Sequence, residues 1–227
     1  MKSHPLDNPV WHSLTSHHAS LSVMNGHAGR YPAEVAPFVA VDSDDTQAAE
    51  QLCRLVDIGE SVYIVGLAPP LTSGWQIQQQ ATVAQMVCSA RIDPGTGPRM
   101  TPLSQQHRAD MLALTALVFP GFFRARTIEM GRYLGIYADT TLAAMAGERM
   151  SMDGYQEISA VCTHPDFLGR GFALQLVAAI SNASIDRGLT PFLHVSHENV
   201  RAKSLYERMG FVDRATLPLW SLRRVAG

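Results

Sequence analysis

Residues 157–173 read EISAVCTHPDFLGRGFA. The first seven residues, 157–163, form an apolar and β-prone run, and Pro165 ends it because proline cannot donate a hydrogen bond to a strand ladder. A helical pattern follows over 174–187. This order predicts a strand, then a glycine-containing loop over 168–173, then a helix.

The glycine-containing loop lies where the predicted helix begins. The first amide groups of a helix have no acceptor within the helix, and the helix dipole adds roughly half a positive charge there. Glycine allows a tight turn and lets a bulky anion approach the backbone closely. One interpretation is therefore a phosphate or pyrophosphate site, and the other is an ordinary tight turn before a helix.

Two well-known phosphate-binding motifs fit this loop badly. A P-loop requires Gly-Lys-Ser or Gly-Lys-Thr at the helix start, where this chain has GFA at 171–173. A dinucleotide fingerprint requires a small residue at the place of Leu174 and an acidic residue closing the next strand. The run PFLHV at 191–195 ends without one.

A second motif follows at 199–211, which reads NVRAKSLYERMGF. Asn199 is a good helix N-cap because its side-chain oxygen can accept from the first-turn amides, and Gly210 suits the position after the last turn. The apolar positions fall at i, i+3, i+4 and i+7, on one face of a short helix. They are Ala202, Leu205, Tyr206 and Met209.

Together the two motifs resemble the GNAT superfamily of acyl-CoA N-acyltransferases, and the resemblance covers residues 99–224. The family loop, Gln/Arg-x-x-Gly-x-Gly/Ala, matches 168–173 at every place but the first, where Leu168 stands. The family's Asn…Ala…Leu-Tyr-Glu-x-x-Gly-Phe matches 199–211. Leu168 removes a possible side-chain contact with pyrophosphate, while the main contacts of such a loop come from backbone amides.

The resemblance implies an α/β (α+β) fold with a mixed, mainly antiparallel sheet, flanked by helices. Its central strands, here 155–163 and 192–195, would splay and admit the pantetheine arm of acetyl-CoA, with no metal. Side chains alternate along a strand, so Glu157, Ser159, Val161 and Thr163 are expected on one face. The residues implied in cofactor binding are Val161, Cys162, Thr163, Leu168, Gly169, Arg170, Gly171, Phe172, Ala173, Asn199 and Tyr206.

The resemblance also implies a reaction: direct transfer of an acetyl group from acetyl-CoA to a primary amine within a ternary complex. Tyr206 is the implied general acid, since a phenol with a pKa of about 10 is protonated at neutral pH; the alternative is a packing aromatic. Glu157 is the first choice for general base and Glu148 the second, although either could be a surface ion pair. His194, His197 and a water chain remain open.

The implied support for the oxyanion is the backbone amide of Val161 or of Cys162. On the acceptor side, three aromatic residues are candidates for the substrate pocket or, alternatively, for simple core. They are Phe119, Phe122 and Phe123.

The N-terminal part has α/β character without either motif, so we interpret it as a degenerate acyltransferase-like half. The turn cluster DPGTGP at 93–98 places the boundary, which gives an N-terminal α/β domain over 1–97 and a GNAT N-acetyltransferase domain over 98–227. Predicted strands are 35–41, 61–67, 76–80, 83–88, 211–214 and 219–223. Asp44 or Asp45 is expected to cap a helix that reaches Leu55.

The composition of the chain is that of an ordinary globular protein. It has 227 residues, 46% hydrophobic and 17% charged, and a net charge of −2 that gives no footprint for nucleic acid. Neither a signal peptide nor a membrane span is expected. Cys53, Cys88 and Cys162 are expected to be free thiols in a reducing, cytoplasmic setting. The N-terminal histidines lack the spacing of a metal site.

Three function hypotheses follow. The first is an acetyl-CoA-dependent N-acetyltransferase, the second a non-catalytic acyl-CoA-binding or sensing module, and the third a nucleotide-binding protein that uses the same loop. Thiol release from acetyl-CoA supports the first, stabilisation by CoA without turnover the second, and stabilisation by ATP or NAD the third. The acceptor amine, the acyl-chain preference and the oligomeric state stay open.

Overall fold

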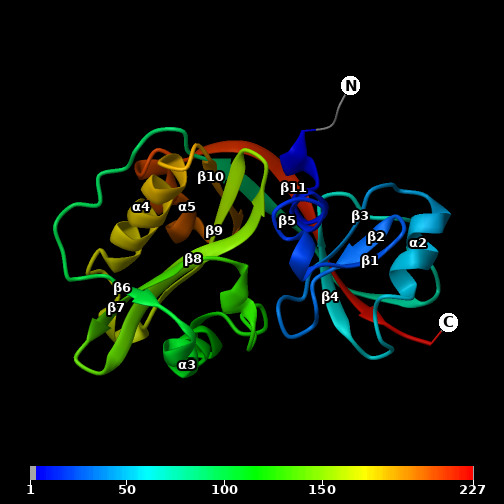
Figure 1. The fold of residues 1–227 in the computed structure, drawn as a ribbon, viewed down its shortest axis with the longest axis horizontal. Coiled ribbons are helices and arrows are strands. Elements are labelled where there is room, and N and C mark those ends of the chain that lie inside the picture. Colours follow the sequence, from blue (N-terminus) through cyan, green and yellow to red (C-terminus); the bar gives the residue numbers. More distant parts are fainter. Residues whose placement is uncertain (1–3, 227) are drawn as a thin grey trace.

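The computed structural model describes residues 4–226 and places eight strands of that range in one sheet (Figure 1). In spatial order they are β4 (Ser61–Val65), β11 (Val212–Arg224), β5 (Trp75–Val87), β10 (Thr190–Ser196), β9 (Tyr155–Thr163), β8 (Thr141–Met152), β7 (Tyr133–Ala138) and β6 (Thr101–Leu103). Within this sheet β9 and β10 pair in parallel, and the other neighbours pair antiparallel. The predicted mixed, mainly antiparallel α/β fold is confirmed.

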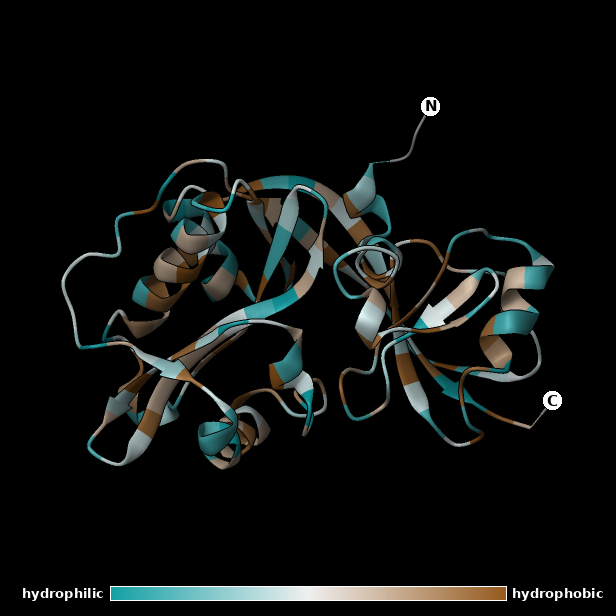
Figure 2. Cartoon of the chain, in the orientation of Figure 1, coloured by the Kyte–Doolittle hydropathy of each residue, from teal (hydrophilic) through white to brown (hydrophobic). Residues whose placement is uncertain are grey.

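Helices cover both faces of this sheet. Figure 1 shows α3 and α4 on opposite sides of the strands β7 to β9. Met111 of α3 packs in one cluster with Met145, and Leu176 of α4 packs in another with Ile158. Both helices carry teal and brown residues in Figure 2, as expected when one side of a helix faces a core. The α-helices are α1 (Pro9–Leu14), α2 (Thr46–Cys53), α3 (Arg108–Val118), α4 (Phe172–Ile185) and α5 (Val200–Arg208).

Two long strands, β5 and β11, differ from the sequence prediction, which divided each of them in two. Ala81 and Thr82 continue β5 because both pair with β11. Pro218 is tolerated inside β11 because its carbonyl accepts from the amide of Gly66, on the β4 side. The amide and carbonyl of one residue point the same way in an antiparallel ladder, so proline costs no bond to β5 here.

The N-terminal segment contributes to the same sheet as the C-terminal motifs. Its strand β5 lies between β11 and β10, and β4 lies at the sheet edge beside β11. Residues 88–100 then run over α4, where Asn182 exchanges two hydrogen bonds with the backbone of Ile92. The predicted boundary at 97/98 falls in this connection, and the division into two domains stays a prediction.

The remaining part of the N-terminal segment packs beside β4. A three-stranded antiparallel sheet holds β1 (Val23–Asn25), β2 (Ala28–Arg30) and β3 (Val39–Val41). β3 is shorter than predicted because the amides of Val35 and Ala36 bond the carbonyl of Pro32 in a turn. Asp45 caps α2 as expected, accepting from the amide of Ala48 at 2.8 Å. Among residues 4–226, no helix combines the length and the hydropathy needed to cross a bilayer.

A buried histidine in this part leads to a prediction about acid stability. His18 lies 3.0 Å from the hydroxyl of Tyr31, and its burial lowers its pKa from 6.5 to about 4. The unfolded chain binds the proton near pH 6.5, so the free energy of unfolding should fall by up to about 3 kcal/mol between pH 6.5 and pH 4.

Urea unfolding at several pH values measures this slope. His18→Asn keeps a polar group near the position of Nδ1 and removes the proton uptake, so its slope over the same range should be smaller. An unchanged slope in the variant would show that other groups cause the acid sensitivity.

Candidate active site

The two central strands part where the motif residues begin. β9 and β10 are paired from Thr190↔Tyr155 to Phe192↔Glu157, and no pairing follows beyond that point. The gap opens into a cleft of about 400 Å³. One wall comes from residues 158–162, residues 193–196, Asn199, Ala202 and Tyr206; the other includes Phe38, Val65, Thr82, Phe119, Phe122, Arg149 and Leu219. The expected splay is present, and the N-terminal segment lines part of the cleft.

A β-bulge in β9 changes which side chains face the cleft. Ser159 pairs with Gly147 and Cys162 with Met145, so β9 contains one more residue than β8 over this step. Ala160, which has a φ of 51°, is the bulged residue. The predicted common face is therefore wrong at Val161 and Thr163, because a bulge shifts the alternation by one residue. Val161 packs in the cluster with Leu176 on the α4 side, and Thr163 pairs with Ala144 of the same cluster.

The backbone of β9 presents free groups to the gap. The amide of His164 donates to the carbonyl of Ala143 in β8 at 2.8 Å. Because backbone groups alternate sides along a strand, those of Val161 and Thr163 point away from β8, toward the gap. Of the two amides predicted to support an oxyanion, that of Val161 is on the open side and that of Cys162 faces β8.

The glycine-containing loop forms an open cradle at the start of α4. Gly169 and Gly171 both have a φ of 78°, and a Cβ at either place would meet nothing within 4 Å. The first helical bond runs from Gln175 to the carbonyl of Gly171. Within residues 4–226, the six amides over 169–174 have no acceptor, and the guanidinium of Arg170 lies aside, 4.9 Å from the ring of Phe167. The cradle can take an anion without rearrangement.

Two motif residues of the α5 region reach the cleft. The ring of Tyr206 is buried, with 7% of the residue exposed, and burial raises the pKa of its phenol to about 12. Asn199 caps α5 by accepting from the amide of Ala202 at 3.1 Å. No acceptor among the described residues engages its Nδ2, which is free to donate to a ligand in the cleft.

A row of polar side chains crosses five neighbouring strands beside the cleft. Arg149 of β8 donates through Nε and Nη2 to Glu157 of β9 at 2.8 and 2.6 Å, and Nδ1 of His194 in β10 lies 2.7 Å from the same carboxylate. The row continues through Gln85 of β5 to Arg214 of β11. Glu157 is entirely buried in it.

The neighbours of Glu157 in this row keep it ionised, and the neighbours of His194 indicate which of its ring nitrogens donates. Burial alone would raise the pKa of Glu157, but the charge and hydrogen bonds of Arg149 and the bond from His194 hold it far below its usual range. Gln85 donates to the carbonyl of Leu6 through the same Nε2 that lies 3.0 Å from Nε2 of His194. His194 therefore accepts at Nε2 and donates from Nδ1 to Glu157.

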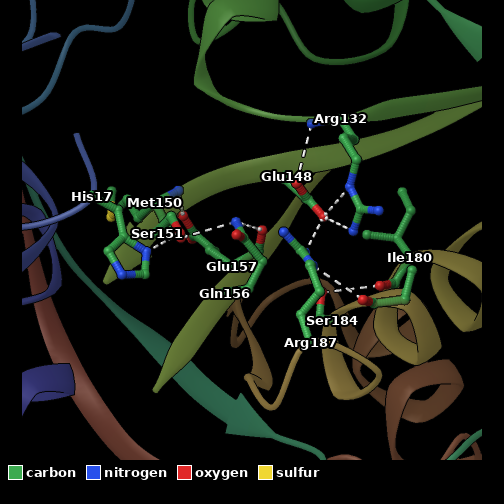
Figure 3. Close-up of polar contacts among 11 residues, drawn as sticks. His17, Arg132, Glu148, Met150, Ser151, Gln156, Glu157, Ile180, Ser184 and Arg187 are labelled. Carbon is green, nitrogen blue, oxygen red and sulfur yellow. Dashed lines mark hydrogen bonds and ion pairs between the residues drawn. The ribbon is translucent and has the colours of Figure 1, made fainter. Parts of the chain in front are cut away.

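Glu148, the second candidate base, lies outside the cleft. It is buried and accepts from Arg132 and from Arg187, which follows α4 (Figure 3). Neighbouring residues of a strand point to opposite faces, so Glu148 faces α4 while Arg149 faces the cleft. Its contacts support a structural ion pair.

The remaining candidates divide between cleft and core. Phe119 and Phe122 line the cleft and stack with their ring centroids 4.9 Å apart. Phe123 lines a smaller side cavity and packs edge-on against Tyr133. His197 is exposed and does not line the cleft. Within residues 4–226, no three His, Cys, Asp or Glu side chains gather as a metal site would require.

Three residues that line or support the site were not predicted from the sequence: Arg149, Gln85 and Phe38. The signal for Arg149 was present, because an arginine inside an otherwise apolar strand, directly after Glu148, needs a buried partner. Phe38 and Gln85 lie more than 60 residues from the first motif and carry no local pattern. Only the sheet order brings them there.

Comparisons with known proteins agree with this geometry. The family model FR47-like protein matches residues 133–220. A solved structure of a GNAT-family protein from Novosphingobium aromaticivorans DSM 12444 is 31% identical, covers 99% of this chain and 100% of its own, and has a TM-score of 0.90. A GCN5-related N-acetyltransferase from Kribbella flavida is 15% identical, covers 91% and 90%, and has a TM-score of 0.62, which shows the fold alone. No curated protein matches the chain significantly.

Proposed function

Because this chain belongs to the GNAT superfamily, whose fold supports acyl transfer, we propose that it moves an acetyl group from acetyl-CoA to a primary amine. The observation that carries the proposal is the cradle of six unbonded amides over 169–174, together with the parted strands β9 and β10. Acetyl-CoA is the co-substrate, and the setting that we propose is the cytoplasm.

The residues present fit a CoA ester along its length. The amides and the α4 dipole suit the pyrophosphate, since both favour negative charge at a helix N-terminus. The backbone groups of Val161 and Thr163 suit the amides of pantetheine, which would pair with β9 as an added strand does. Asn199 supplies a further donor from the start of α5.

The reaction that we propose is direct attack in a ternary complex. The amine nitrogen bonds to the acetyl carbon, the carbon–sulfur bond breaks, and the leaving thiolate takes a proton while the amine loses one. We assign support of the negative charge on the acetyl oxygen to the Val161 amide, which points away from β8. Tyr206 is the proposed proton donor, and the general-base role of Glu157 stays a prediction.

An acyl-enzyme route through a cysteine is disfavoured by the site. Cys162 lines the cleft, but burial raises the pKa of its thiol to about 12. The thiolate is the nucleophilic form of cysteine, so at neutral pH Cys162 is a poor nucleophile. This supports direct attack by the amine.

Thiol release on mixing the protein with acetyl-CoA and a broad amine panel tests the proposal. Acceptor-dependent release is the expected result. Thermal stabilisation by CoA with no release for any amine would instead favour the non-catalytic acyl-CoA-binding module.

Leu168 provides a gain-of-affinity prediction. Half of this residue is exposed at the edge of the cradle, where many family members carry glutamine or arginine. Leu168→Arg should lower the Kd of CoA about 3-fold or more at low salt, because an added cation at an exposed site gains a charge-assisted contact with phosphate.

Calorimetric titration of CoA measures this effect. Leu168→Met, which adds no charge, is the matched control and should bind as the parent protein does. The gain should shrink as salt rises, since salt screens exposed charges. Equal affinities of all three proteins for CoA at low salt would show that the pyrophosphate does not bind beside residue 168.

A further inference from the structure

We propose that the acceptor is an amine that carries a carboxylate and an otherwise apolar body, and that Arg149 binds this carboxylate. The inference rests on the proposed acetyl transfer and names the class of substrate for the same cleft. Hydrophobic α-amino acids are the simplest members of this class.

The guanidinium of Arg149 has one side engaged and one side free. A guanidinium offers two pairs of parallel N–H donors, and each pair matches the two oxygens of a carboxylate. Glu157 occupies the pair formed by Nε and Nη2. Among residues 4–226, no acceptor lies within hydrogen-bonding distance of Nη1, so the second pair is without a partner.

Arg149 borders the cleft with part of its side chain. Arg149 lines both the main cleft and the adjoining side cavity, with 14% of its side chain exposed. Its guanidinium carbon lies 4.7 Å from the centre of the Phe38 ring. This stacking and the bonds to Glu157 hold the group rigid, which lowers the entropy cost of binding an anion.

The charge of the cleft restricts the acceptor further. Arg149 is the one Lys, Arg, Asp or Glu side chain among the described residues that line it, since Glu157 is sealed beneath. A cleft built for a polycationic amine would present carboxylates, and this one presents none in the described range. Glu157 neutralises the charge of Arg149 but leaves the second pair of donors available.

Aromatic side chains line the same cleft as Arg149. Phe38, Phe119 and Phe122 line this space, and Phe119, which is more than half exposed, offers aromatic surface that an apolar substrate body would cover. Arg149 approaches both the cleft and these rings, so a bound carboxylate would leave its apolar body among them. A free α-amino acid with a large apolar side chain has both the carboxylate for Arg149 and the apolar body for the aromatic rings.

Wild-type protein and pairs of acceptors provide the decisive test. Thiol release from acetyl-CoA is measured with L-phenylalanine against 2-phenylethylamine, and with L-leucine against 3-methylbutylamine, at equal concentrations of neutral amine. The carboxylate-bearing member of at least one pair should have a kcat/KM at least about 10-fold higher. L-Phenylalaninamide serves as a third partner, since it offers one neutral carbonyl in place of the carboxylate.

Variants assign the preference to the guanidinium. Arg149→Lys keeps a cation beside Glu157 but loses the second pair of donors, so the KM for the preferred amino acid should rise about 10-fold while that for its decarboxylated partner changes little. Arg132→Lys is the matched control: Arg132 pairs with buried Glu148 outside the cleft and should leave both values unchanged. The wild-type comparison stands if Arg149→Lys fails to fold.

The outcomes separate this inference from the proposed function. Three outcomes overturn the carboxylate inference and leave acetyl transfer intact. They are turnover of other amines but of none of these amino acids, equal turnover within both pairs, and equal turnover of phenylalanine and its amide. No thiol release with any amine overturns both. If Arg149→Lys keeps the preference for the amino acid over its decarboxylated partner, another group binds the carboxylate, and the inference about Arg149 is overturned.

Discussion

Replacing Tyr206 with phenylalanine should lower kcat about 100-fold and leave the Kd of acetyl-CoA nearly unchanged. The substitution removes one oxygen from a ring that lines the cleft and packs 5.9 Å from the ring of Phe211. Phenylalanine keeps that packing, so the expected loss is that of the proton donor. General acid–base groups commonly contribute 10²- to 10⁴-fold.

The raised pKa of Tyr206 is compatible with this role. At about 12 it keeps the phenol protonated throughout the working range, so kcat should not fall between pH 7 and pH 10 through loss of this proton. A thiolate that leaves in the same buried place would have its own pKa raised by the same loss of solvent, which keeps the two groups comparable.

Single-turnover and steady-state thiol release measure the effect. Tyr137→Phe is the matched control, because its hydroxyl bonds Asp110 at 2.7 Å and does not line the cleft. If Tyr206→Phe keeps the full kcat, the Tyr206 ring has a packing role only, and a water molecule protonates the thiolate.

Replacing Glu157 with glutamine should cost about 3 kcal/mol or more of stability at neutral pH. The carboxylate is entirely buried, and Arg149 would be left charged and without its counter-ion. Breaking one partner of a buried ion pair is strongly destabilising for this reason. Glu207→Gln is the control, since its carboxylate is about half exposed and lies 4.0 Å from Lys203.

The pH dependence of this stability follows from the direction of the pKa shift. The folded pKa of Glu157 lies below the ordinary value of 4.5. The stabilisation is therefore fully present above pH 4.5 and is lost as the pH falls below that value, where the unfolded chain takes up a proton first. Urea unfolding at pH 7 and pH 4 should show the parent losing more stability than Glu157→Gln does.

The same variant tests the general-base prediction. A base whose pKa is far below neutral accepts a proton weakly, so we expect the acidic limb of kcat/KM against pH to persist in Glu157→Gln, with activity lowered through a displaced Arg149. Disappearance of that limb would assign the proton transfer to Glu157 itself. The two results distinguish a positioning residue from a catalytic one.

Local patterns were sufficient for the elements that carry the motifs. The strand at 155–163, the loop at 168–173 and the capped helix after Asn199 were all predicted where the structure has them, because proline, glycine and N-cap chemistry act over a few residues. The same local reasoning divided β5 and β11 wrongly. Pro218 breaks a strand only where its missing donor is needed, and that depends on which neighbour lies beside it.

The sequence by itself determined the family and the place of the glycine-containing cradle, since both depend on neighbouring residues in the chain. Only the tertiary structure decided what faces the cleft. The bulge at Ala160 turned Val161 to the α4 side, and the pairing of β5 with β10 brought Gln85 to His194. Long-range strand order, which no short pattern contains, also placed β10 beside β9 and so brought His194 to Glu157, 37 residues away along the chain.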